Sequence, residues 1–372
     1  MKKRIYLDNN ATTEPDEAVL AALGEAFKVF GNPSSSHYFG QEAKHILVKA
    51  RDMIAQYFNV LPQEVIFTSG ATEGLNMCMR GFFGFYPKGH LITSSCEHAA
   101  VYETANCLKE AGLPVTFLNP GVWGAVSPQQ VLESIRPDTN LIVLMAANSE
   151  TGVKTDYEAI AEIAATRKIA FVVDGVQLLG KEPFSLPRGV SAISFSAHKI
   201  HGPKGIGFTI IRKGFRLAPF ISGGNQEFGK RAGTENVAAI AGLAKAIELL
   251  SDQKVYTLKM ATLRDHFEKE LIGLGGVSVN GEGPRIANTS NLAFEGIEGE
   301  VLLLKLDLEG LAASHGSACS TGALEPSRVL LNMGYSKERA GSSVRFSLCR
   351  HTEKEEIERA ISIIKKILKK LR

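Results

Sequence analysis

The chain has few cysteines and no long apolar run, and both features exclude classes of protein. Its five cysteines form an odd set without a CxxC pair: Cys78, Cys96, Cys107, Cys319 and Cys349. This argues against a disulfide framework and against a structural zinc site. No 18 uncharged apolar residues follow one another, and no apolar run precedes Asp8. We therefore expect a cytoplasmic protein that crosses no membrane.

A basic tract is also missing, because the formal net charge of +3 is spread along the 372 residues. Nucleic acid is therefore not an expected partner. Apolar residues make up 44% of the chain, and a single core stops growing near ~250 to 300 residues. We predict a large domain over residues 13–253 and a small α+β domain formed by residues 1–12 and 254–372.

Short apolar runs alternate with helical patterns through the first two thirds of the chain. The expected strands are residues 65–67, 91–93, 141–145, 170–173 and 190–195, and helical spacing marks residues 41–58 and 159–167. This alternation predicts an α/β fold with a mainly parallel sheet built from right-handed βαβ units.

After residue 253 the pattern changes. Helices are expected at residues 266–274, 300–307 and 355–371, and strands at 277–279, 291–294 and 344–348. These elements predict the compact α+β unit of the small domain.

Polar or reactive residues follow every expected strand of the large domain. They include Thr72, His98, Asn148, Asp174, Gln177, His198 and Lys199. Because ligands of such sheets bind at the carboxyl ends of the strands, these residues are expected to share one site. A single aspartate after a strand is more often a turn or cap residue, but seven such positions are hard to assign to caps alone.

Two of these segments have more than one interpretation. Lys199, at a strand end in a polar cluster, is a candidate Schiff-base former, although a surface lysine in a glycine-rich turn is the plain alternative. The turn at residues 68–74 suits a phosphate at a helix start. It lacks the P-loop lysine and the GxGxxG spacing, so an ordinary helix cap is equally compatible with it.

Cys319 differs from the other cysteines because it lies among small, polar residues, four positions after His315. A thiol in such a loop is accessible, as a nucleophile must be. The alternative is an inert free cysteine.

Taken together, these segments resemble the cysteine desulfurases of the NifS/IscS type, in the class V aminotransferase superfamily of fold-type I pyridoxal-phosphate enzymes. The resemblance covers nearly the whole chain. Its motifs are residues 6–13, 31–37, 68–73, 97–98, 174–177, 196–207, 231–234, 316–319 and 343–347.

The resemblance implies a role for each matching residue. Lys199 would form the Schiff base with pyridoxal 5′-phosphate, Asp174 would pair with the pyridine nitrogen and Gln177 would donate to the phenolic oxygen. His98 would stack on the ring and transfer protons, and Arg345 would clamp the substrate carboxylate. Phosphate ligands would be Ala71, Thr72, Ser196 and His198, with Thr234 coming from the neighbouring subunit of a homodimer.

The sequence departs from the family pattern in a few places. Ser149 occupies the position of a common asparagine, so Ser149 and the adjacent Asn148 are both candidate cofactor contacts, and Asn148 is also a candidate substrate contact. Asn225 replaces a glycine and Phe228 replaces a common arginine. The chain ends soon after its last expected helix, without the tail of longer relatives that bind a scaffold protein.

The activity implied is conversion of L-cysteine to L-alanine with a persulfide left on Cys319, which supplies sulfur to an acceptor such as an iron–sulfur scaffold. Rivals in the same superfamily are a selenocysteine lyase and an aminotransferase, and the Cys319 loop argues against the latter. A sulfur-carrier adaptor would not need both Lys199 and Asp174, and a dinucleotide-binding protein would want GxGxxG after its first strand.

Overall fold

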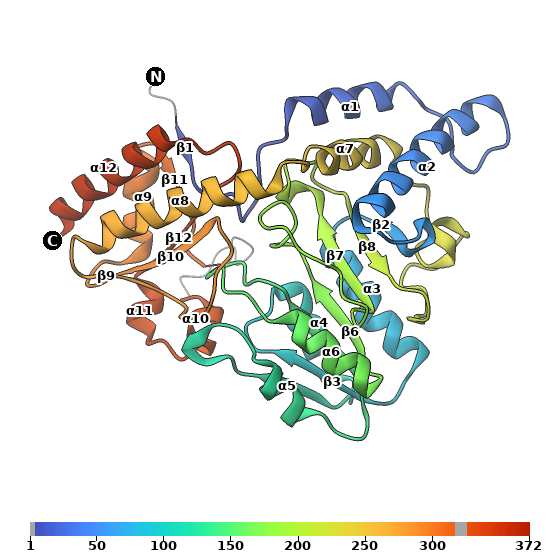
Figure 1. Ribbon diagram of the computed structural model, residues 1–372, viewed down its shortest axis with the longest axis horizontal. Coiled ribbons are helices and arrows are strands. Elements are labelled where there is room, and N and C mark those ends of the chain that lie inside the picture. The colour runs from blue at the N-terminus through green and yellow to red at the C-terminus, as the bar shows by residue number, and fades with distance from the viewer. Residues whose placement is uncertain (1–3, 317–325) are drawn as a thin grey trace.

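A seven-stranded sheet forms the larger part of the molecule in the computed structural model, which describes residues 4–316 and 326–372 (Figure 1). Its strand order is β2-β8-β7-β6-β5-β3-β4. β8 runs antiparallel to both of its neighbours, β2 and β7, and every other adjacent pair of strands is parallel. The strands are β2 (Val65–Thr68), β3 (His90–Ser94), β4 (Val115–Leu118), β5 (Thr139–Met145), β6 (Ala170–Asp174), β7 (Ala192–Ser196) and β8 (Gly207–Ile211).

Both faces of this sheet are buried because successive side chains of each strand point to opposite faces and both sets are apolar. Phe171 and Val173 of β6 pack with α2, α6 and α7, whereas Val172 between them packs with α3 and α4. The helices of this unit are α1 (Glu17–Phe27), α2 (Tyr38–Phe58), α3 (Ala71–Phe85), α4 (Ala99–Glu110), α5 (Pro128–Ser134), α6 (Tyr157–Arg167) and α7 (Val237–Glu248).

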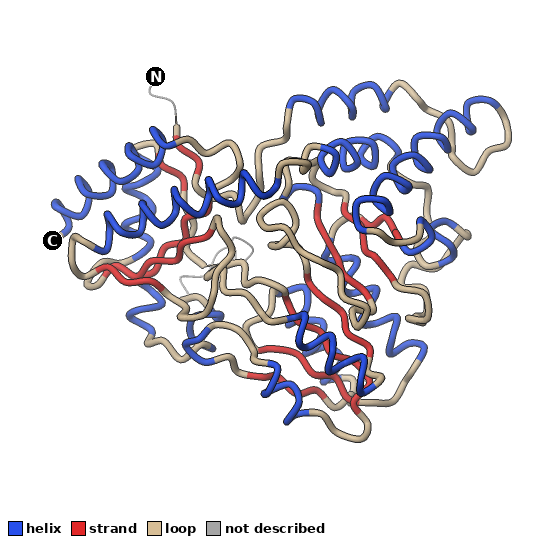
Figure 2. Tube along the Cα trace, viewed as in Figure 1, coloured by secondary structure: helices blue, strands red, loops and turns tan. Residues whose placement is uncertain are grey.

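The rest of the chain has its own sheet and core. An antiparallel sheet, ordered β12-β10-β9, packs against α8, α9 and α12, with Phe267, Phe294 and Phe346 fully buried. Figure 2 shows these strands beside two long helices. The elements are β9 (Val277–Val279), β10 (Thr289–Phe294), β12 (Ser343–Ser347), α8 (Gln253–Ile272), α9 (Gly299–Leu308), α10 (Arg328–Asn332), α11 (Lys337–Gly341) and α12 (Lys354–Leu371).

The N-terminal strand lies with this second unit. β1 (Ile5–Tyr6) pairs in parallel with β11 (Leu311–Ala312), and Ile5 and Leu7 belong to the second core. The chain then passes to the large sheet through Asn10 and Ala11. Residues near the start of the chain are thereby brought to the junction of the two units.

The predicted α/β class with a mainly parallel sheet is confirmed. Several details differ from expectation. β7 begins at Ala192 rather than at residue 190, β4 and the antiparallel β8 are strands that the sequence pattern did not reveal, and α8 is one helix of 20 residues starting at Gln253. The division into two domains near residue 253 stays a prediction.

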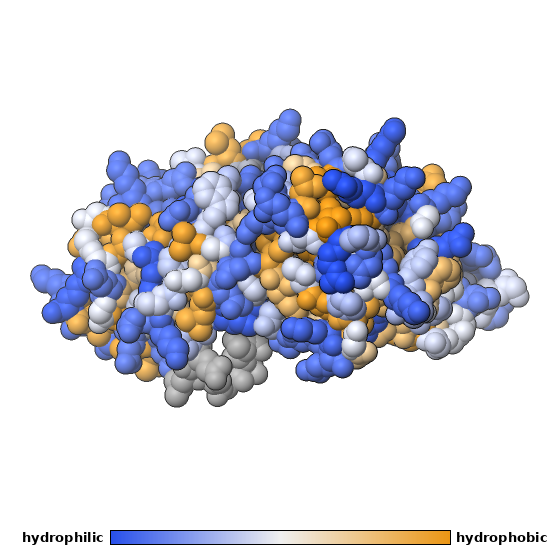
Figure 3. All heavy atoms as spheres, turned by 90° about the horizontal axis from the view of Figure 1, so that it is seen from below, coloured by the Kyte–Doolittle hydropathy of each residue, from blue (hydrophilic) through white to orange (hydrophobic). Residues whose placement is uncertain are grey.

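Figure 3 shows hydrophobic residues in separate groups between hydrophilic ones on one face of the molecule. None of the helices in the described part of the chain is both long and apolar enough to cross a membrane.

Candidate active site

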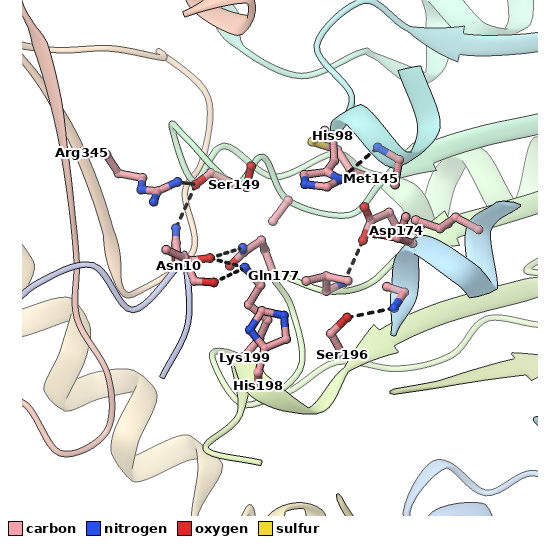
Figure 4. Close-up of a pocket in the computed structure, with 17 residues that line it drawn as sticks. Asn10, His98, Met145, Ser149, Asp174, Gln177, Ser196, His198, Lys199 and Arg345 are labelled. Carbon is pink, nitrogen blue, oxygen red and sulfur yellow. Dashed lines mark hydrogen bonds between the residues drawn. The ribbon is translucent and has the colours of Figure 1, made fainter. Parts of the chain in front are cut away.

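A cavity lies at the carboxyl edge of the large sheet, and most of the predicted site residues line it (Figure 4). The lining residues are Asn10, Ala11, Ala71, Thr72, Leu75, His98, Ala100, Met145, Ala147, Ser149, Asp174, Val176, Gln177, Ser196, His198, Lys199 and Arg345. They come from the ends of β2, β3, β5, β6 and β7 and from the second unit. Parallel strands end at one edge, which is why residues far apart in the sequence meet here.

Lys199 ends the short 3₁₀ turn Ala197–Lys199 that follows β7. Its Nζ donates to the backbone oxygens of Asn10 at 2.5 Å and Ala11 at 2.8 Å. The amine is therefore held in the cavity by the segment that joins the two units. The alternative of an ordinary surface lysine does not fit this environment, since the side chain is partly buried and lines the cavity.

Asp174 is the last residue of β6 and is buried. Its Oδ1 accepts the backbone N–H of Val176 at 3.0 Å. Burial raises the pKa of this carboxyl, against the opposing influence of His98 and Lys199. A buried carboxylate costs free energy unless a positive charge or donor compensates it, so this position favours a cationic ligand atom.

His98 follows β3 and caps the N-terminus of α4. Its Nδ1 accepts the backbone N–H of Ala100 at 3.1 Å. In the neutral ring the proton must then be on Nε2, because one imidazole nitrogen accepts while the other donates. His98 lines the cavity, so that N–H is available for proton transfer there.

The N-terminus of α3 faces the same cavity without a side-chain cap. Its N-cap residue is Gly70, and the backbone N–H of Ala71 donates to Ser196 Oγ at 2.9 Å. A helix start with free N–H groups and a nearby hydroxyl is a suitable anion site. His198 lies beside it, with Nδ1 at 3.2 Å from Thr12 Oγ1. Burial and nearby lysines lower the pKa of His198 to about 4, so the ring is neutral at physiological pH.

Arg345 enters the cavity from β12 of the second sheet. Its Nη1 donates to Ser149 O at 3.0 Å and its Nη2 to Asp8 Oδ1 at 2.7 Å. The buried Nε has no hydrogen-bond partner in the described residues. A planar guanidinium with an unused donor fits a carboxylate ligand.

Two predicted residues in the described part of the chain, Asn148 and Thr234, are not among those that line the cavity. Asn148 is buried and shapes its own turn, where Oδ1 accepts the backbone N–H groups of Glu150 and Thr151 and Nδ2 donates to Cys96 O. Whether Asn148 also contacts the cofactor or the substrate stays a prediction, whereas Ser149 does line the cavity. Thr234 is exposed on this chain, and Cys319 lies outside the described residues.

The sequence reasoning missed Asn10, Ala11 and Lys181. Asn10 is buried, and its backbone oxygen accepts from both Gln177 Nε2 and Lys199 Nζ. The first two residues lie in the segment 6–13 that carries the resemblance, but nothing in the local pattern indicates that this segment reaches the strand ends.

The structure gives a physical account of one departure from the family pattern. The centre of the exposed Phe228 ring lies 5.0 Å from the guanidinium carbon of Arg51, and the centre of the Phe67 ring lies 4.7 Å from the same atom. Arg51 also forms a buried bidentate pair with Glu227. An aromatic ring thus stabilises a cation at this position. Nothing in the structure explains the change at Asn225.

Comparison with known proteins finds a family and relatives that match almost the whole chain. The family model for aminotransferase class V matches residues 5–360. A cysteine desulfurase IscS of Dictyoglomus turgidum is 42% identical over 379 residues, covering 100% of this chain and 96% of the relative. One of Methanosarcina thermophila is 41% identical, covering 100% and 93%.

Solved structures are also similar. A NifS-like protein superimposes with a TM-score of 0.92 at 35% identity, covering 98% of this chain and 99% of the other. A NifS-like protein from Rickettsia africae gives 0.88 at 30% identity, with the same coverage. The family model and these relatives match nearly the full length of the chain, and the geometry of the site is consistent with them. The chain therefore belongs to the class V aminotransferase family.

Proposed function

We propose that this protein is a pyridoxal-5′-phosphate-dependent cysteine desulfurase, which converts L-cysteine to L-alanine and retains the sulfur as a persulfide on Cys319. The observation that carries the proposal is the meeting of Lys199, Asp174, His98 and the N-terminus of α3 in one cavity. The relatives named cysteine desulfurase support it.

The residues of the cavity fit this cofactor. Lys199 offers an amine for the aldehyde, and the N-terminus of α3 with Ser196, Thr72 and His198 offers donors for the phosphate. The buried Asp174 carboxylate would pair with a protonated pyridine nitrogen, which supplies the positive charge that this burial favours. When bound, pyridoxal phosphate supplies an electron sink that weakens the bonds to the α-carbon of an amino acid.

The remaining residues bind and orient the substrate. Arg345 would hold its carboxylate, with the position of the guanidinium fixed by Ser149 O and Asp8. Lys199 Nζ is the base placed to take the α-proton. His98 Nε2 can also hold or return a proton, because Nδ1 already accepts the backbone N–H of Ala100.

The sulfur transfer needs one thiol from the chain. The Cys319 thiolate attacks the sulfur of the bound cysteine, the bond between sulfur and the β-carbon breaks, and the β-carbon gains a proton to give alanine. Thiol and cysteine thus become persulfide and alanine, and no external oxidant is consumed.

The proposed partners follow from the resemblance. A homodimer would bring Thr234 of each chain to the site of the other, and an acceptor such as an iron–sulfur scaffold would collect the persulfide sulfur. We expect both in the cytoplasm.

Incubation with cysteine followed by peptide mass spectrometry tests this function. We expect alanine in solution and one additional sulfur on the peptide that contains Cys319. The Cys319→Ser variant should still bind the cofactor and release no alanine, because a hydroxyl does not attack sulfur as a thiolate does. Alanine formation by that variant at the wild-type rate would overturn the proposed sulfur acceptor.

A further inference from the structure

A second lysine is buried behind the cavity, and the proposed reaction gives it no role. Lys181 is 3% exposed and ends the turn, residues 176–181, that follows Asp174 and contains Gln177. Within the described residues its Nζ donates only to amide oxygens, those of the Gln177 and Asn10 side chains. A buried lysine without a carboxylate partner is costly, so its placement calls for a function.

The two oxygens that Lys181 contacts belong to residues that line the cavity. Nζ donates to Asn10 Oδ1 at 3.0 Å and also to Gln177 Oε1. Gln177 Nε2 in turn donates to Asn10 O at 3.2 Å, the same backbone oxygen that accepts from Lys199 Nζ. Figure 4 shows Gln177 and Asn10 side by side near Lys199. Lys181 therefore hydrogen-bonds the side chains of Asn10 and Gln177, and Asn10 in turn contacts Lys199.

This contact fixes the orientation of the Gln177 amide. An amide has an acceptor end and a donor end of nearly equal shape, and only its hydrogen bonds decide which end faces which way. With Oε1 held by Lys181, Nε2 is turned toward Asn10 O and the cavity. A flipped amide would turn Oε1 toward Asn10 O, so that two acceptors face each other, and Nε2 would lose that acceptor and face the Lys181 amine instead.

The arrangement does not require a charge on Lys181. Burial, followed by the positive charges of Lys199 and Arg345, holds the pKa of its amine well below the usual range. A neutral amine keeps two N–H donors, which match the two amide oxygens.

We propose that Lys181 is a positioning residue, which fixes the side-chain amide of Gln177 so that Nε2 is presented to the cavity as a donor. The ligand atom it serves is an anionic oxygen on the ring of the bound cofactor, because an amide oxygen turned toward that atom would repel it. This inference rests on the proposed function.

A double-mutant cycle with pyridoxal 5′-phosphate as the probe tests the inference. The variants are Lys181→Met, Gln177→Met and the double variant, with Lys245→Met on the surface of α7 as the control. The readouts are the dissociation constant of the cofactor and the position of the visible absorbance band of the bound form. Thermal unfolding of each cofactor-free protein reports separately on stability.

Each single variant is expected to weaken cofactor binding by about tenfold, the size of one lost hydrogen bond, and to shift the band in the same direction. In the Gln177→Met background the Lys181→Met substitution should change affinity by less than about twofold, because Lys181 then has no amide to orient. Lys245→Met should match the wild type. Additive effects, or an unchanged band in Lys181→Met, would overturn the inference.

The Lys181→Arg variant adds a test that does not depend on the folding of Lys181→Met. Its guanidinium keeps N–H donors for Gln177, so affinity within about threefold of wild type is expected. A loss as large as that of Gln177→Met would contradict the positioning role. If the wild-type protein bound no cofactor covalently, the proposed function and this inference would both fail; normal wild-type binding with additive variants would overturn the inference alone.

Discussion

Some residues of the cavity lower the stability of the cofactor-free fold and also serve in ligand binding, and Asp174 is the clearest case. Its buried carboxyl has a raised pKa in the folded chain. The folded cofactor-free protein therefore holds this proton more tightly than the unfolded chain, and stability is lost as the pH rises from about 4 through the folded-state pKa.

Asp174→Asn should accordingly stabilise the cofactor-free protein at pH 7 to 8 by roughly 1 to 3 kcal/mol, the usual cost of an uncompensated buried polar group. The gain should disappear as the pH falls toward 4. The same variant should bind pyridoxal phosphate more weakly, because the neutral amide cannot pair with a cationic ring. Chemical denaturation at several pH values, with and without cofactor, measures both effects. Equal loss of stability at every pH would contradict the assignment.

Arg345 gives a second prediction at the scale of the residue. Arg345→Lys should raise KM for cysteine by roughly 10- to 100-fold, because a lysine cannot replace a bidentate contact worth about 1.5 to 3 kcal/mol. Steady-state kinetics of alanine release measure the change. Arg285→Lys, which alters another Arg–carboxylate pair, the partly buried one with Glu268, is the matched control and should leave KM within about twofold. An equal increase in both variants would indicate a general structural effect.

The sequence predicted the residues that follow strands and missed those that arrive from elsewhere. Asp174, Gln177 and Lys199 could be found because each lies at or within a few residues after the end of an apolar run, and parallel strands share an edge. Asn10 could not, because its position depends on the pairing of β1 with β11, about 300 residues away. Lys181 follows an apparently ordinary Leu-Leu-Gly turn, and its burial depends on tertiary packing alone.

At the scale of elements, the position of α3 depends on close contact with the sheet. A side chain at Gly74 would place its Cβ 2.1 Å from Thr209 Oγ1 on β8 and 2.8 Å from Ser194 Oγ on β7. Glycine therefore lets the helix approach the strands and brings its N-terminus to the cavity.

Gly74→Ala should push α3 away from β7 and β8, reduce stability by roughly 1 to 3 kcal/mol and weaken cofactor binding. Gly24→Ala is the matched control, since Gly24 lies in α1 and a Cβ there meets nothing within 4 Å. That substitution should be neutral or stabilising by up to about 1 kcal/mol. Denaturant titration and cofactor binding measure the pair, and similar behaviour of the two variants would refute this role for Gly74.

Elements with simple periodicity were predicted and those set by packing were not. The long apolar β5 and the amphipathic α12 agree with expectation to within one or two residues. β8 was missed because its sequence, Gly-Phe-Thr-Ile-Ile, follows a glycine-rich turn and carries no sign of its antiparallel direction.

At the scale of the whole molecule, the proposed homodimer has a direct consequence. Sedimentation should give a mass of about 80 kDa, twice the 40.2 kDa of the chain. If Thr234 of each chain completes the site of the other, mixing Thr234→Val with Lys199→Ala should produce heterodimers that regain activity, because one of their two sites is then intact. Inactive heterodimers, confirmed as such by two different tags, would contradict a shared site.

The central claim is that the cavity binds pyridoxal phosphate through Lys199, and chemical trapping tests it most directly. The holoenzyme is reduced with borohydride, digested and analysed by mass spectrometry. Because Lys199 lines the cavity while Lys181 is buried behind Gln177, we predict the cofactor mass on the peptide containing Lys199 and none on that containing Lys181. Label on Lys181, or no label on either lysine, would contradict the account.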